Sequence, residues 1–138
     1  MKEPIMDSTA TATMAVAATD LASALPQLEP QDAFPAVLAT ARLVALMEVA
    51  SARLLHLCLG EGEMSVGVNV DISHTAPTPE GATLTATARY LGRDGKLFVF
   101  EVSAADAGGE VGRGRHKRAI VNAARLQNSA LRRVGASR

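Results

Sequence analysis

Aromatic residues are scarce in this chain, which has three Phe, one Tyr and no Trp among 138 residues. A hydrophobic core must therefore be built mainly from Ala, Val and Leu. The interleaved aromatics on which single-stranded nucleic acids stack are missing, which argues against that class of binding protein. Cys58 is the single cysteine, so no intramolecular disulfide can form and nothing requires an oxidising compartment. We interpret Cys58 as a small buried hydrophobe.

Long apolar runs are also missing, and none approaches the roughly 20 residues that span a bilayer. The N-terminus is not typical of a signal peptide, because Glu3 and Asp7 stand where positive charge belongs and threonines interrupt its apolar segment. We therefore expect a soluble, cytoplasmic protein without membrane contact. The length suits one domain with one core, and a hydrophobic content of 48% is enough to build it.

Acidic residues are lacking after Glu110, although the formal net charge of the chain is zero. Residues 111–138 hold eight of the 14 Lys and Arg, and several of them cluster in 113–118. Such a cluster suits a phosphate-bearing ligand or nucleic acid, and equally a solvated strand edge. For the last six residues we favour a solvated, frayed end.

The expected organisation is a disordered segment at residues 1–9, one domain at 10–128 and a basic tail at 129–138. Residues 11–19 are small or β-branched and are interpreted as a first strand. Residues 25–35 carry three prolines and predict a loop.

The strongest pattern is a helix over 40–59, closed by Gly60 as a left-handed C-terminal residue. Apolar residues recur there at the helical spacing of a buried stripe, namely Leu43, Leu46, Met47, Ala50, Leu54 and Leu57. Glu48 lies between apolar neighbours and is a candidate for burial, which costs free energy unless the carboxylate has a partner or a use. The alternative is that its stem reaches solvent.

Four further strands are predicted at 65–72, 83–91, 96–106 and 110–123, with tight turns at 92–95 and 107–109. Alternation places one set of residues on a single face of the first of these strands: Val66, Val68, Val70 and Ile72. A helix that is apolar over most of its circumference must be wrapped. One curved antiparallel sheet of about five strands around one central helix, the α+β hot-dog arrangement, meets that need. Its free edges favour a homodimer.

Three polar residues suggest chemistry. Thr40 stands at the start of the helix, Glu48 lies within it, and His74 falls just past a strand, so that its facing is not fixed. A hydroxyl, a carboxylate and an imidazole suit acyl transfer. The alternatives are an N-cap for Thr40 and a turn residue for His74. Gly67 interrupts a β-branched strand, which indicates either a bulge or close approach of a ligand, with an N–H free for an oxyanion.

The sequence resembles the hot-dog-fold fluoroacetyl-CoA thioesterases and related acyl-CoA thioesterases. The similar segments are "FPAVLATARLVALMEVASAR" (34–53), "SVGVNVDISHTAPTPEGATLTATARY" (65–90) and "VGRGRHKRAIV" (111–121). The resemblance covers about residues 30–126, most of the domain.

The resemblance implies a homodimer that hydrolyses a small acyl-CoA, with CoA as part of the substrate and no metal or other cofactor. It implies Thr40, Glu48 and His74 as the catalytic set. It also implies that Gly67 holds the thioester carbonyl, that Arg118 is the strand arginine and that Phe34 lies in a lid over the acyl group. We further expect Arg113 and Arg115 to meet the CoA phosphates.

Three other functions compete with hydrolysis. A hot-dog hydratase or dehydratase needs an Asp and His pair in a spacing that is not present here. A non-catalytic acyl-CoA-binding protein would not need all three reactive side chains. Nucleic-acid binding has only the basic C-terminus in its favour.

Overall fold

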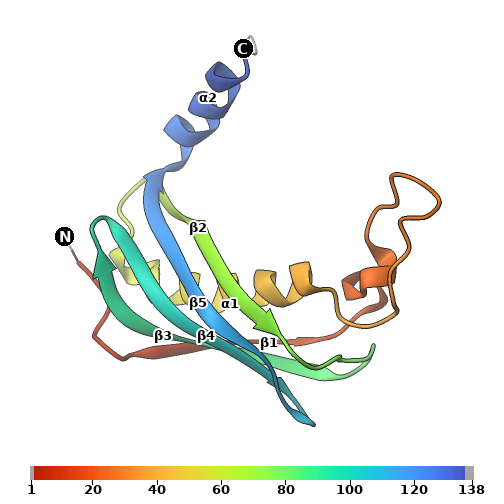
Figure 1. The fold of residues 1–138 in the computed structure, drawn as a ribbon. Coiled ribbons are helices and arrows are strands. Elements are labelled where there is room, and N and C mark those ends of the chain that lie inside the picture. Colours follow the sequence, from red (N-terminus) through yellow and green to blue (C-terminus); the bar gives the residue numbers. More distant parts are fainter. Residues whose placement is uncertain (1, 136–138) are drawn as a thin grey trace.

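The computed structural model describes residues 2–135, and in it a five-stranded sheet curls around one long helix, α1 (Figure 1). Neighbouring strands are antiparallel throughout, in the order β1-β3-β4-β5-β2. The strands are β1 (Thr9–Ala15), β2 (Glu63–His74), β3 (Thr83–Asp94), β4 (Leu97–Asp106) and β5 (Gly109–Asn122). The predicted hot-dog arrangement is therefore confirmed, and β2 forms one edge of the sheet.

Helix α1 (Thr40–Leu55) starts where the sequence predicted and fills the concave side of the sheet. Of the predicted stripe, four residues are buried. They pack in one core cluster with three of the four aromatic residues: Tyr90, Phe98 and Phe100. Alanines at the facing strand positions let the sheet approach the helix closely.

The end of the predicted helix is wrong. After Leu55 the chain tightens into a 3-10 turn, His56–Cys58, which leaves Leu57 exposed. Gly62, with φ 75°, adopts the left-handed conformation that the sequence assigned to Gly60. Cys58 is only partly buried, and this burial raises the pKa of its thiol, which disfavours the thiolate form.

The N-terminal segment differs from the expectation of disorder. Strand β1 already begins at Thr9, and the Asp7 amide donates to the Tyr90 carbonyl. The Tyr90 hydroxyl donates to the Glu3 carboxylate at 2.6 Å. A buried tyrosine needs such an acceptor, and its burial and this hydrogen bond raise the pKa of Tyr90. Met1 lies outside the described residues.

A β-bulge at Val68 interrupts β2, because its register on β5 shifts between Gly67 and Asn69. Gly67 before the bulge and Val70 after it therefore share the face toward α1. The predicted single face is wrong for this reason, since strict alternation cannot continue through an extra residue: Val66, Val68, Val70 and Ile72 do not all point the same way.

A second helix, α2 (Ala123–Arg133), follows β5 and extends away from the sheet (Figure 1). The sequence patterns did not indicate this helix, and the predicted domain boundary at residue 128 falls within it. The Asn122 side chain caps it by accepting from the Arg125 amide, and Ala, Leu, Gln and Arg favour helix. Residues 136–138 of the predicted tail lie outside the described residues. No helix within 2–135 has the length and apolar character to cross a membrane.

Candidate active site

The first residue of α1 meets the last residue of β2. Thr40 Oγ1 and His74 Nδ1 lie 2.9 Å apart. Both line an open cleft of about 330 Å³ whose other walls include small or cyclic side chains, among them Ala22, Pro35, Val37, Ala76 and Pro77. His74 Nε2 is buried and has no hydrogen-bond partner within residues 2–135. The imidazole therefore has one nitrogen on the hydroxyl and one left for a bound group.

Backbone anchors explain why this pair forms. His74 is still part of β2, not past it as predicted, and the loop that follows is tied to β5 through the Thr75 amide on the Val111 carbonyl. The same loop accepts the Leu38 amide at the Thr78 carbonyl, so it is also fixed to the segment leading into α1. The Thr78 hydroxyl is buried and donates to Asp106 at 2.7 Å.

The N-cap alternative for Thr40 is wrong. Ala39 occupies the N-cap position, and no side chain caps the first turn of α1. The Thr40 hydroxyl is therefore directed at His74, and the amides of the first helical turn add positive potential beside it.

Glu48 lies two turns further along α1, about 12 Å from Thr40 along the helix axis. Its Oε1 accepts a hydrogen bond of 3.0 Å from Arg118, whose side chain is almost fully buried. Arg118 also donates to the hydroxyl and carbonyl oxygens of Ser65. The Glu48 side chain is 39% exposed, so it is half-buried and partnered. Within one chain the predicted catalytic residues thus form two groups.

Gly67 faces the Glu48 carboxylate. A Cβ at this position would overlap Glu48 Oε1 and would lie 3.1 Å from the His116 ring. Gly67 is also the residue at which the bulge begins. The bulge interpretation of this glycine is confirmed, and what approaches it closely within the chain is the Glu48 side chain.

His116 is the site residue that the sequence analysis missed. It is buried beside Arg118, 4.0 Å from Glu48 Oε1. The available signal was the alternation of β5, which places Gly112, Gly114, His116 and Arg118 on one face. Small residues followed by large polar ones on a buried face indicate a site rather than packing.

Phe34, the predicted lid residue, is 51% exposed. It lies next to Pro35, which lines the cleft over Thr40 and His74. Phe34 itself is not among the residues that line the cleft.

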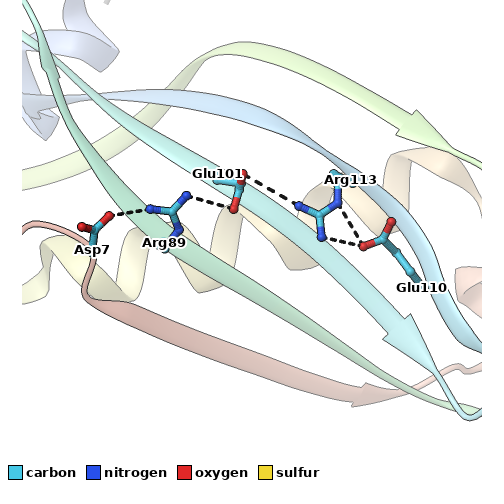
Figure 2. A network of polar contacts seen from close by, with 5 residues as sticks. All are labelled: Asp7, Arg89, Glu101, Glu110 and Arg113. Carbon is cyan, nitrogen blue, oxygen red and sulfur yellow. Dashed lines mark hydrogen bonds and ion pairs between the residues drawn. The ribbon is translucent and has the colours of Figure 1, made fainter.

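Arg113 and Arg115 lie on the opposite face of the sheet. They alternate with Gly114 and His116, whose face is turned toward α1. Arg113 is engaged with Glu110 at 2.8 Å and with Glu101 at 3.8 Å. It belongs to a network that crosses the outer face (Figure 2), formed by Asp7, Arg89, Glu101, Glu110 and Arg113. The structure does not bring these two arginines to the Thr40–His74 cleft.

Comparison with known proteins gives a family match over residues 16–124, to the family described as fluoroacetyl-CoA-specific thioesterase. A curated relative, the fluoroacetyl-CoA thioesterase of Streptantibioticus cattleyicolor, is 42% identical over 89 residues. That alignment covers 64% of this chain and 64% of the relative's length.

Solved structures agree with this match. The fluoroacetyl-CoA thioesterase FlK superposes with a TM-score of 0.87 at 32% identity, covering 96% of this chain and 98% of FlK. A thioesterase-superfamily protein of Thermus thermophilus, with a TM-score of 0.82 and 24% identity, covers 97% of this chain and 95% of its own. The second likeness bears on the fold alone.

Proposed function

The chain belongs to the fluoroacetyl-CoA-specific thioesterase family, and from this we propose that it is a cytoplasmic homodimer that hydrolyses a small acyl-CoA to free acid and CoA. The observation that carries the proposal is the Thr40–His74 contact of 2.9 Å inside a cleft. The buried Nε2 of His74 without a partner supports it, because such a nitrogen suits proton transfer to a bound group.

Solved FlK structures support the assignment of Thr40 and Phe34. They include a threonine-to-alanine variant with fluoroacetate and a phenylalanine-to-alanine variant with fluoroacetate and CoA. The substituted phenylalanine precedes the substituted threonine by six residues in FlK. Phe34 precedes Thr40 by the same separation here.

In the proposed first step the Thr40 hydroxyl attacks the thioester carbonyl as His74 takes its proton. The carbon–sulfur bond breaks, its electron pair leaves on the CoA sulfur, and His74 returns the proton to that sulfur. Water then cleaves the threonyl ester to release the acid. The amides at the start of α1 and the N–H of Gly67 of the partner subunit are the proposed donors to the oxyanion.

A homodimer would bring the two groups of site residues nearer to each other. Strand β2 is a free edge, with Val68 and Val70 53% and 46% exposed. Antiparallel pairing of two β2 strands over their length puts the two-fold axis near Val68. Gly67 then lies roughly 13 Å along the strand from His74 of the partner subunit, against roughly 23 Å within its own chain. We therefore assign each cleft Thr40 and His74 from one protomer and Glu48 from the other.

Glu48 has the role of activating water in the second step. Arg118 keeps the carboxylate oriented, and a carboxylate held beside a cleft can take a proton from water. In single turnover in heavy-oxygen water, this mechanism puts label in the product acid alone. Label found in Glu48 would instead indicate attack by the carboxylate and an anhydride.

Thiol release over a short panel of acyl-CoA esters tests the function. We expect release from small acyl groups, acetyl-CoA and fluoroacetyl-CoA among them, and a fall in kcat of about 10²- to 10⁴-fold for His74→Ala and for Glu48→Gln. Thr40→Val should behave alike, while Thr40→Ser retains a hydroxyl and much of the activity. A decrease below about tenfold for both His74→Ala and Glu48→Gln would place the site elsewhere. Binding without thiol release would indicate the non-catalytic acyl-CoA-binding protein.

A further inference from the structure

The Glu48 carboxylate belongs to a buried network in which one member, His116, has no part in the chemistry described above. Arg118 makes four hydrogen-bond contacts in this network. Its Nε and one terminal nitrogen go to Ser65, and its other terminal nitrogen contacts Glu48 Oε1 at 3.0 Å and His116 Nε2 at 3.1 Å. The guanidinium is thus fixed by β2 on one side and by Glu48 and His116 on the other.

The partners of His116 determine its protonation state. Its Nδ1 lies 2.8 Å from the Asn69 carbonyl oxygen, which only accepts, so Nδ1 carries the proton. Its Nε2 faces the Arg118 guanidinium, which only donates, so Nε2 is an unprotonated acceptor. Both contacts are satisfied only by the neutral imidazole protonated at Nδ1.

The charges around the ring agree with this tautomer. Burial is the largest effect, and it lowers the pKa of His116. The hydrogen bond to the Asn69 carbonyl, second in size, raises the pKa, the positive charge of Arg118 lowers it, and the Glu48 carboxylate raises it least; the net shift is downward. Among these neighbours Glu48 comes from α1, Arg118 from β5 and Asn69 from β2.

We propose that His116 is a positioning residue of the thioesterase, which holds Arg118, and through it Glu48, in the orientation that hydrolysis requires. The inference rests on the proposed function. Its geometric core is that Arg118 shares one terminal nitrogen between the carboxylate and the imidazole. Loss of the imidazole acceptor leaves that nitrogen free to turn, and Glu48 turns with it.

The bulge in β2 gives this network a link to the sheet edge. The Asn69 carbonyl that selects the His116 tautomer follows the extra residue Val68 directly. The same edge is the one proposed to pair with a second copy. The carbonyl, the imidazole, the guanidinium and the carboxylate thus form one sequence of contacts that begins at that edge.

The kinetic test compares two variants. His116→Leu replaces the imidazole with an apolar side chain of similar bulk, whereas His116→Gln keeps a hydrogen-bond acceptor near the position of Nε2. We expect His116→Leu to lower kcat about 10²-fold with KM within about twofold, since misplacement of about 1 Å has that effect. His116→Gln should recover most of kcat. The control is His56→Gln at an exposed histidine, which should leave kcat and KM unchanged. A folded His116→Leu with wild-type kcat, or a fall in kcat that His116→Gln does not relieve, would overturn the proposal.

Nitrogen-15 NMR of the wild-type imidazoles gives a readout that does not depend on turnover or on folding of a variant. We expect His116 to show a protonated Nδ1 and an unprotonated Nε2 at pH 7. An Nε2–H tautomer or an imidazolium at that pH would refute the inference. If the wild-type protein releases no thiol from any acyl-CoA, the proposed function fails, while the tautomer still reports on the network itself.

Discussion

At Gly67 the edge strand β2 passes so close to the Glu48 carboxylate that no side chain fits between them. The position opposite Glu48 and the His116 ring has no room for a methyl group. Any side chain there must displace the carboxylate, which sits at the end of a flexible stem, or the more rigid imidazole. Because glycine has no side chain, Gly67 leaves the Glu48 carboxylate and the His116 ring in their positions.

Gly67→Ala is therefore expected to fold but to lose activity. The methyl group pushes Glu48 Oε1 away from its place between Gly67 and Arg118, and a shift of about 1 Å is enough for a roughly 10²-fold loss in kcat. Steady-state thiol release measures this, with a thermal melt to confirm folding. Gly108→Ala in the β4–β5 turn, where the nearest atom is 3.2 Å away, is the matched control. An active Gly67→Ala would mean that the carboxylate need not stay there.

The lowered pKa of His116 predicts a pH-dependent stability. As pH falls through the ordinary histidine value of 6.5, the unfolded chain binds the proton before the folded chain does. The free energy of unfolding therefore decreases on acidification below that value. Chemical denaturation between pH 7.5 and pH 5 should show a steeper decrease for the wild type than for His116→Gln, with His56→Gln keeping the wild-type slope. Parallel slopes for wild type and His116→Gln would contradict it.

At the scale of elements, β2 has more roles than any other strand. It supplies His74 at its end, Gly67 and Ser65 to the Glu48 network, and a free edge with exposed valines. An exposed edge of this length invites pairing with another chain unless it is covered. The site and the proposed dimer are thus built from the same strand.

Val68→Lys tests that edge. Residues near a two-fold axis face their own copies, so two lysines would meet and repel each other. We expect the variant to sediment as a monomer and to lose thioesterase activity together with dimerisation. Val134→Lys, at a valine that is 66% exposed beyond α2, should remain a dimer. A wild-type protein that is already a monomer would contradict the proposed assembly.

Patterns within elements were reliable where one physical cause dominated. The apolar stripe of α1 marked a helix because only one face can meet the sheet, and Leu43 and Met47 are buried as expected. The valine alternation of β2 gave a wrong prediction of which residues share a face. A bulge reverses the face of the residues that follow it, and the amino-acid composition of the strand gives no sign of it. α2 was missed because its residues are polar and it covers little of the core, so helix propensity rather than burial defines it.

At the scale of the whole molecule the sheet separates two kinds of chemistry. The concave face holds α1 and the candidate catalytic groups, while the outer face carries the ion-pair network (Figure 2). The strand alternation that buries His116 and Arg118 necessarily turns Arg113 and Arg115 outward.

A role of Arg113 and Arg115 in binding CoA phosphates thus requires the nucleotide end of CoA to lie over the outer face. In that case an Arg113→Gln, Arg115→Gln double variant raises KM for acyl-CoA several-fold at unchanged kcat, as loss of charge-assisted hydrogen bonds does. The control is Lys117→Gln, on the same face and paired with Asp94, with unchanged KM. An unaltered KM in the double variant removes these arginines from the binding site.

By itself the sequence determined the wrapped helix, the strand order along the chain and the family, because these follow from local periodicity, turn residues and motif spacing. It also named Thr40 and His74, whose hydroxyl and imidazole suit acyl transfer. Only the tertiary structure decided that these two touch while Glu48 pairs with Arg118, that a bulge redirects β2, and that His116 joins the network. Those facts depend on which strands become neighbours and in what register, and register is set by contacts between residues far apart in the chain.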